Sequence, residues 1–243
     1  MKKLLIVIAT VCLVLGLNYG ASAWVYVPAQ GDTNGWLTYT YTAGATGFEG
    51  TAGFVSSNAG DNLAYSELLI DNLRGGGVTN PSFELGNLTG YTAVSEPPFL
   101  SSINVTPSVT AISYNAYTAT NGVEFADIQS YYINSAMTQY GVTTSQFTNA
   151  SGQSGTTGGI LETGITLAAG ATFSFDWAFL GNDTLPGDFG LFYLKDASGN
   201  IVFSEGLAQI GTAAVPIPAS VLLLGSGLLG LLGLSRRGKK RVS

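Results

Sequence analysis

The chain has 243 residues, of which nine are basic and fifteen acidic, with no histidine and a single cysteine, Cys12. The lack of histidine excludes histidine-based catalytic triads and the commonest zinc sites, and one cysteine cannot form an internal disulfide. All fifteen acids lie between Asp32 and Glu205, a stretch with only two bases, so this acidic body is unsuited to binding nucleic-acid phosphates.

Residues 1–23 have the three parts of a secretory signal peptide. A short positive start precedes a 14-residue apolar run, and the small residues Ala21-Ser22-Ala23 follow as a cleavage site. We therefore expect the exported protein to begin at Trp24. Cys12 lies inside the apolar run and is removed with it.

Residues 24–78 are typical of short strands separated by glycine-rich turns. Within them, the segment 36–42 alternates between apolar or aromatic residues and threonine. This pattern predicts a half-buried strand with Leu37, Tyr39 and Tyr41 on one face.

Glycine spacing predicts where this first part of the chain turns. Four glycines recur at intervals of three and predict breaks in the chain: Gly44, Gly47, Gly50 and Gly53. Residues 68–73 predict another strand, and the three glycines at 75–77 predict the turn that ends it.

The segment 80–91 reads Asn-Pro-Ser-Phe-Glu-Leu-Gly-Asn-Leu-Thr-Gly-Tyr. It resembles the N-x-S-F-E-x-G…G-W opening of galactose-binding-like jelly rolls, which include many carbohydrate-binding modules, with Tyr91 in the place of tryptophan. The resemblance implies a structural calcium ion ligated by the motif's glutamate, here Glu84. The residues themselves predict Phe83 in the core and turns at the glycines.

Residues 124–140 have the one convincing helical pattern of the body, and the capping-box spacing at 143–146 leaves a second short helix open. Apolar and aromatic residues recur within 124–140 at intervals of three and four, and Gly141 follows as a stop signal. We expect the helix at 124–140 to be a short insertion that covers one open end of a β fold.

The second half of the body returns to strand patterns. Residues 172–179 alternate, with Phe173, Phe175 and Trp177 on one face, and 190–193 and 201–203 predict two more strands. Short strands with aromatic alternation and glycine turns indicate a mainly β fold, a jelly-roll-like β-sandwich.

Asp183 and Asp188 flank a proline–glycine turn between two predicted strands. Acidic side chains close together in a loop supply the oxygen ligands that calcium prefers, and Glu84 of the motif would join them. A solvated turn without metal is the alternative. We expect no cofactor other than this structural calcium.

The last segment, 215–243, has three parts in order. It begins with a proline motif, continues as an uncharged run to Leu234 and ends in basic residues. The proline motif is Val215, Pro216, Ile217, Pro218 and Ala219; the basic residues are Arg236, Arg237, Lys239, Lys240 and Arg241. The uncharged run is about 30 Å long as a helix, roughly the thickness of the bilayer's hydrocarbon layer. We expect a membrane helix over about 219–234 and a cytoplasmic C-terminus.

This order of parts resembles the PEP-CTERM sorting signal in its VPxPA variant, with Ile217 in the place of the glutamate. The resemblance covers residues 215–241. It implies recognition by an exosortase-type membrane protease, which removes the tail and passes the protein toward the cell surface or extracellular matrix. A plain tail anchor without processing is the alternative, because hydropathy cannot separate the two.

The sequence thus divides into a signal peptide at 1–23, a β-sandwich ectodomain at 24–214 and a sorting segment at 215–243. We expect an exported surface or matrix protein, transiently anchored in the inner membrane, with a structural or adhesive role linked to extracellular polysaccharide. A carbohydrate-binding module with a defined glycan ligand is the alternative. No catalytic motif is present, and the acids that a glycosidase would need are scattered singly, so we expect no enzyme activity.

Overall fold

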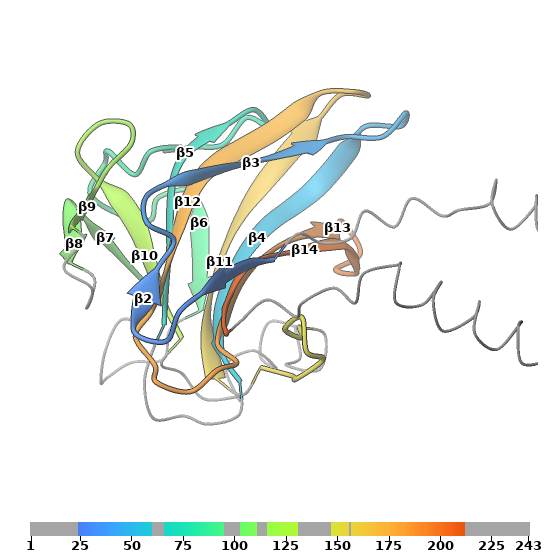
Figure 1. The fold of residues 1–243 in the computed structure, drawn as a ribbon. Helices are drawn as coiled ribbons and strands as arrows, with labels where there is room; N and C mark the ends of the chain where they lie inside the picture. The colour runs from blue at the N-terminus through green and yellow to red at the C-terminus, as the bar shows by residue number, and fades with distance from the viewer. Residues whose placement is uncertain are drawn as a thin grey trace, which may run out of the picture. The chain divides into compact units, whose positions relative to one another are not determined.

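The computed structural model describes residues 24–59, 66–94, 103–110, 116–130, 147–155 and 157–211. These residues contain fourteen strands and no helix (Figure 1). The mainly β fold class predicted from the sequence is therefore confirmed for them. The predicted signal peptide and the predicted sorting segment lie outside the described residues. The described part of the chain contains no apolar helix of membrane-spanning length.

Six strands form the first sheet. In spatial order they are β1 (Val25–Val27), β14 (Ile201–Ile210), β13 (Phe189–Asp196), β4 (Phe48–Asn58), β11 (Thr157–Leu167) and β6 (Tyr91–Val94). Only the β1–β14 pair is parallel among these, with Val25 opposite Ala208. The sheet therefore joins the first described strand directly to the last one.

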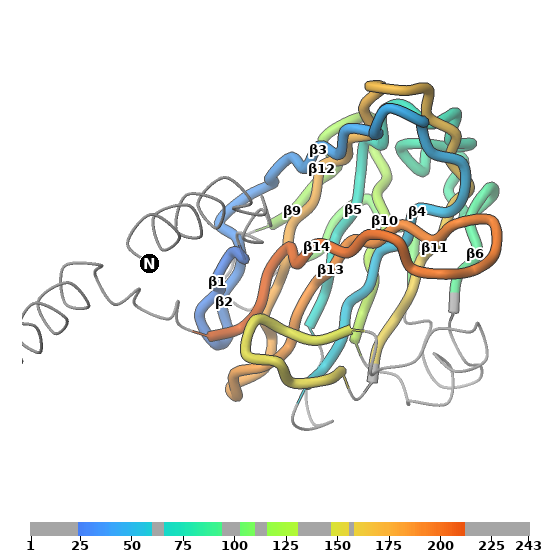
Figure 2. The backbone as a smooth tube through the Cα atoms, turned by 90° about the vertical axis from the view of Figure 1, so that its right-hand side faces the viewer, coloured from blue at the N-terminus to red at the C-terminus, as the bar shows by residue number. Residues whose placement is uncertain are grey.

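The second sheet also has six strands. In spatial order they are β2 (Gly31–Asp32), β12 (Thr172–Gly181), β5 (Glu67–Arg74), β10 (Phe125–Gln129) and β7 (Ile103–Thr106), and β3 (Leu37–Thr42) also pairs with β12. A separate hairpin consists of β8 (Ser108–Thr110) and β9 (Ala116–Thr118). The two sheets lie face to face, with β13 and β14 in front of β5 and β12 in the view of Figure 2.

Aromatic side chains fill the space between the sheets. Phe175 of β12 meets Phe54 of β4 edge-on at a centroid distance of 4.9 Å, and Phe192 of β13 at 5.1 Å. The predicted row on β12 is confirmed, because its aromatic residues all belong to this core. Strand β3 also alternates as predicted: its three threonines are exposed and its apolar and aromatic residues pack inward.

Each sheet also buries apolar side chains on its outer face. On the second sheet, Leu69, Phe125 and Leu180 form a cluster with Tyr117 of the β8–β9 hairpin. On the first sheet, a similar cluster gathers around Tyr193 and includes Phe147. Central strands are therefore buried on both faces, which removes the simple alternation that marks a half-buried strand.

The predicted helix at 124–140 is wrong in its first part. Residues 125–129 form β10, which pairs with β5 on one side and β7 on the other. Phe125 packs in the outer cluster and Ile128 in the core between the sheets, so a spacing of three reflects two buried faces of a strand. Residues 131–146 lie outside the described part of the chain.

Two of the four predicted glycine breaks are also wrong. Gly44 and Gly47 do form a turn, closed by a hydrogen bond from the Gly47 N–H to the Gly44 carbonyl at 3.0 Å. Gly50 and Gly53 instead lie inside β4. The ring of Tyr193 lies over Gly53, where a methyl group would stand 2.1 Å from Tyr193 Cζ. Glycine is needed there for close packing.

This close approach predicts that alanine in place of Gly53 destabilises the fold far more than alanine in place of a strand glycine with free space around it. We expect Gly53→Ala to lower the free energy of unfolding by about 1–3 kcal/mol, because the new methyl group must displace a buried ring. The matched control is Gly164→Ala in β11, where the methyl group meets nothing within 4 Å. That change should be neutral or slightly stabilising. Urea denaturation of the full chain measures both, and equal effects would contradict the packing argument.

Candidate functional site

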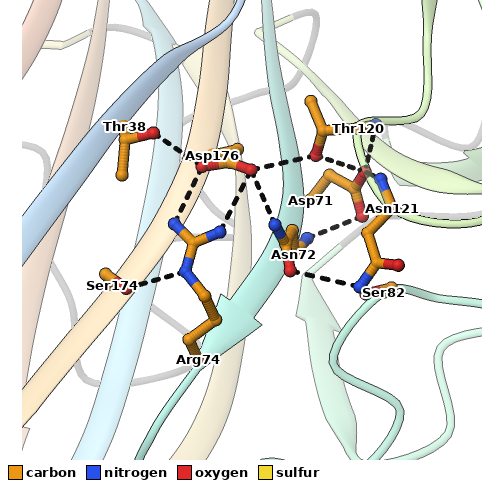
Figure 3. A network of polar contacts seen from close by, with 9 residues as sticks. All are labelled: Thr38, Asp71, Asn72, Arg74, Ser82, Thr120, Asn121, Ser174 and Asp176. Atoms are coloured by element: carbon orange, nitrogen blue, oxygen red, sulfur yellow. Dashed lines mark hydrogen bonds and ion pairs between the residues drawn. The ribbon is translucent and has the colours of Figure 1, made fainter.

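A polar network lies on the outer face of the second sheet, outside the core (Figure 3). It connects β3, β5 and β12 with the loops that follow β5 and β9. Its nine members are Thr38, Asp71, Asn72, Arg74, Ser82, Thr120, Asn121, Ser174 and Asp176. We call these residues the Asp71–Asp176 network.

Strand register brings the two carboxylates together. Asp176 of β12 lies opposite Asp71 of β5 on one side and Thr38 of β3 on the other. The β12–β5 register shifts between Ser174 and Asp176, which marks a bulge at this point. Two like charges directly opposite each other are destabilising unless each finds its own donors. The network supplies these donors.

Arg74 neutralises Asp176 through two hydrogen bonds, from Nη2 to Oδ1 at 2.8 Å and from Nη1 to Oδ2 at 3.2 Å. Thr38 and Asn72 donate to the same carboxylate, each at 2.8 Å. Burial alone would raise the pKa of Asp176, but these hydrogen bonds outweigh it and lower the pKa to about 2. Asp176 is therefore ionised at neutral pH.

Asp71 is held mainly by backbone donors. Its Oδ2 accepts hydrogen bonds from the backbone N–H groups of Thr120 at 2.6 Å and Asn121 at 3.0 Å, and Oδ1 accepts one from Asn72 at 2.6 Å. Thr120 Oγ1 lies 2.8 Å from Asp71 and 3.0 Å from Asp176, so its single proton can serve either carboxylate. Burial raises the pKa of Asp71 more than these hydrogen bonds lower it. Asp71 thus ties the loop after β9 to β5.

A pocket of about 340 Å³ is lined by residues that are close in sequence to members of this network. The lining residues are Asn34, Gly35, Trp36, Ala116, Tyr117, Thr118 and Ala119. Trp36 Nε1 donates to the Thr118 carbonyl at 3.0 Å, and the Trp36 ring meets the Tyr117 ring edge-on at a centroid distance of 5.9 Å. Two residues further along each segment, Thr38 and Thr120 belong to the Asp71–Asp176 network. The pocket therefore combines aromatic rings with a nearby polar surface.

The three predicted calcium ligands are not brought together. Glu84 Oε1 accepts the backbone N–H groups of Val123 at 2.8 Å and Glu124 at 2.9 Å, and so holds the loop before β10. Asp183 Oδ1 accepts the backbone N–H of Leu185 at 2.9 Å, inside the β12–β13 connection. Within the described part of the chain, no three histidine, cysteine, aspartate or glutamate side chains gather where they could hold a metal ion.

Asp188 lies in the interior at one end of the two sheets. Its side chain is buried, with Oδ2 accepting a hydrogen bond from Ser66 Oγ at 2.7 Å and Oδ1 accepting one from the Ala59 N–H at 3.2 Å. The Ser66 N–H in turn donates to Ser130 Oγ at 2.7 Å. This carboxylate connects the end of β4 and the start of β5 to β13, rather than standing in a solvated turn.

The motif at 80–91 does fold as one compact unit. Phe83 is fully buried in the core, although its φ is 59°, and stacks on Tyr91 at a centroid distance of 4.8 Å. Asn80 holds the loop, since its Nδ2 donates to the Asn87 carbonyl at 2.9 Å. The predicted core position of Phe83 is confirmed, and Gly86 and Gly90 have the positive φ values of turn residues.

Sequence reasoning missed the residues at the centre of the network. The proline motif at 215–219 and the basic residues at 236–241 lie outside the described residues. Asp71 and Asp176 carried no recognisable motif. One signal was available: Arg74 is one of two basic residues in the body, so a carboxylate partner could be expected for it.

Comparison of the chain with protein-family models, with curated proteins and with solved structures gives no match. The assignment of a function therefore depends on the sequence motifs and on the geometry described above.

The Asp71 contacts predict that replacing its carboxylate by an amide of nearly the same shape destabilises the fold. We expect Asp71→Asn to lower the free energy of unfolding by about 2–3 kcal/mol, because an amide nitrogen would face backbone N–H groups that need an acceptor. Glu49→Gln is the control, since Glu49 is an exposed acid on β4. Urea denaturation at pH 7 measures both changes. An Asp71→Asn protein as stable as the control would contradict the role assigned to this carboxylate.

Proposed function

We propose that this chain is an exported cell-surface or extracellular-matrix protein whose ends are removed during export and sorting. Its ectodomain has a structural or adhesive role linked to extracellular polysaccharide, and an exosortase-type protease removes the tail. One observation carries this proposal beyond the terminal motifs. The described β fold runs from Trp24 to Gly211, so both predicted processing regions lie beyond its strands.

Packing at the start of the fold supports cleavage after Ala23. The Trp24 ring meets Phe189 edge-on at a centroid distance of 6.2 Å. It also covers Gly206, where a methyl group would lie 2.1 Å from Trp24 Cε2. Cleavage between Ala23 and Trp24 therefore leaves the packing of Trp24 and the parallel β1–β14 pair intact.

The other end of the fold has a similar arrangement. Strand β14 ends at Ile210, and the Gly211 N–H donates to the Val27 carbonyl at 3.0 Å. The proline motif begins four residues later, at Val215. A protease that cuts at this motif would leave every strand of the described residues in place. The prolines favour an extended backbone, which a protease needs in its substrate.

We also propose the finer fold type, a galactose-binding-like jelly roll. Two sheets packed face to face and the compact loop at 80–91 support this assignment, since the loop carries the motif on which the resemblance rests. The burial of Phe83 agrees with its place in that motif.

Replacing the motif prolines tests the sorting step. We expect the double variant Pro216→Ala, Pro218→Ala to insert into the inner membrane but to accumulate there as uncut precursor, because alanine is tolerated in a membrane helix while the extended segment is lost. The mass of the protein recovered from the surface fraction measures processing at both ends. The parent should begin at Trp24 and lack the basic tail.

The matched control is the double variant Pro97→Ala, Pro98→Ala, which removes two adjacent prolines elsewhere. It should be processed like the parent. If the parent is never cut, or the motif variant is released as efficiently as the parent, the protein is a plain tail-anchored surface protein and the sorting proposal is wrong.

A second candidate function is the binding of a defined glycan, favoured by the pocket around Trp36. Aromatic side chains offer apolar faces to sugar rings, and the neighbouring hydroxyl and amide groups offer hydrogen bonds. The pocket joins Trp36 and Tyr117 with the exposed Asn34.

Two substitutions test this pocket. We expect Asn34→Ala and Trp36→Phe to weaken binding at least tenfold on a glycan panel, because the first removes a polar group and the second shortens the aromatic surface. Val202→Ser, an exposed change on β14 of the other sheet, is the control and should bind like the parent. If no glycan binds the parent, or both pocket variants bind as tightly as the control, this candidate fails and the structural role stands alone.

A further inference from the structure

Two buried carboxylic acids, Glu67 of β5 and Asp127 of β10, lie on the outer face of the second sheet, away from the Asp71–Asp176 network. Their exposed fractions are 5% and 4%. In the β10–β5 register Gln129 is opposite Glu67 and Asp127 is opposite Leu69, so the two acids are diagonal neighbours. Diagonal neighbours on one sheet face are within reach of long side chains.

One oxygen of each acid is occupied by a neighbouring amide. Asn182 Nδ2 donates to Glu67 Oε1 at 3.2 Å, and Gln129 Nε2 donates to Asp127 Oδ2 at 3.0 Å. The other oxygens, Glu67 Oε2 and Asp127 Oδ1, are buried and have no hydrogen-bond partner among the residues that the structure describes. Buried polar atoms without a partner are rare and costly, and each needs a physical explanation.

Within the part of the chain that the structure describes, no basic side chain binds this pair. Between residues 24 and 214 the only basic side chains are Arg74 and Lys195, and the chain has no histidine. Arg74 is bound to Asp176 at 2.8 Å, and Lys195 to Glu162 of the first sheet at 2.6 Å. Among the described residues, the positive charge that balances Glu67 and Asp127 is therefore left to bound protons or to a bound cation.

We propose that Glu67 and Asp127 form a binding site for Ca²⁺, with Glu67 Oε2 and Asp127 Oδ1 as its anionic ligands. Calcium prefers oxygen ligands and accepts carboxylate and amide oxygens in flexible geometry. Asn182 and Gln129 can add such oxygens, since turning a side-chain amide exchanges its oxygen and nitrogen. This site is separate from the one predicted at Glu84, Asp183 and Asp188.

Calcium would replace the protons that the pair holds when metal is absent. Burial raises the pKa of Glu67 to about 8, helped by the charge of Asp127, and burial raises the pKa of Asp127 to about 7. Among the described residues, the polar side chains that flank the pair are uncharged amides: Gln129 of β10, Asn182 just after β12, and Asn104, which lies opposite Asp127 on β7. Binding of Ca²⁺ therefore releases protons from the acids into solution.

The test uses the full chain, purified in mild detergent, with calcium chloride as the probe. Titration calorimetry at pH 7.5 should show one Ca²⁺ per chain, with a heat that depends on the buffer because protons are released. Calcium at a hundredfold excess over its dissociation constant should raise the melting temperature by about 5–10 °C.

Substitutions assign the binding to this pair. In Glu67→Gln with Asp127→Asn, Ca²⁺ affinity should fall at least tenfold and the thermal response should vanish. Without calcium the same double variant should melt at or above the parent temperature at pH 7.5, which shows that it folds. Glu84→Gln is the matched control and should keep the response. Loss of the response in Glu84→Gln alone would place calcium at the motif instead and overturn the proposal.

The pH dependence of stability distinguishes a site that binds calcium from a pair of acids that only shares a proton. Because the folded pKa values are raised, the pair stabilises the fold fully below pH 4, and this stabilisation is lost as the pH rises through 7 and 8. In the parent, saturating calcium should abolish the loss between pH 5 and 8. A loss that persists with calcium, or a parent that binds none, would show a shared proton only and overturn the proposal.

Discussion

Between residues 24 and 214 the chain has fifteen acidic side chains and only two basic ones, Arg74 and Lys195. This imbalance decides how each buried carboxylate is stabilised. Each sheet contains one of the two bases. Arg74 forms an ion pair with Asp176 in the second sheet, and Lys195 forms one with Glu162 in the first. The remaining buried acids need other donors. Asp71 uses backbone N–H groups, and Asp188 uses a serine hydroxyl and a backbone N–H. Hydrogen bonds of this kind to a carboxylate are stronger than those between neutral groups, so they stabilise both side chains.

The outer faces of both sheets combine apolar clusters with buried polar side chains. Apolar clusters cover part of the outer face of each sheet, and several carboxylates there are buried, among them Glu67, Asp71 and Glu162. On the first sheet, Tyr193 lies over Gly53 and its hydroxyl donates to Glu162 on the strand beyond. Lys195 then binds the same carboxylate. A missing side chain at Gly53 thus allows an aromatic ring to connect three neighbouring strands.

Sequence patterns predicted the strands that are buried on one face. Strand β3 was recognisable because its threonines face outward while its aromatic residues face the core. Strand β10 was not, since Phe125 and Ile128 are buried on opposite faces and imitate helical spacing. Gly53 was misread as a break for a related reason. Its role depends on Tyr193, which is 140 positions away in the sequence and adjacent only through strand pairing.

The Asp71–Asp176 network was beyond sequence reasoning for a different physical reason. Arg74 was a signal for a carboxylate partner, but the chain contains fifteen acids, and only the β12–β5 register and its bulge select Asp176. Phe83 was predictable because its motif is local and its core role needs no distant partner. The three predicted calcium ligands do not lie together, because a position beside a turn does not determine where a side chain points. Asp188 points into the interior, where Ser66 and Ala59 donate to it.

Strand β5 links the two polar regions of the second sheet. Its outward-facing residues are Glu67, Leu69 and Asp71, so a buried acid, an apolar contact and a second buried acid follow one another along the strand. Asp71 holds the loop after β9, next to the hairpin residues Tyr117 and Thr118 that line the pocket. A cation at Glu67 would join β5 to β10, whose Phe125 contacts Trp36 in that pocket at 5.4 Å. Glu67 and Asp71 therefore lie toward opposite ends of one strand, and each is linked through its neighbours to residues that line or contact the pocket.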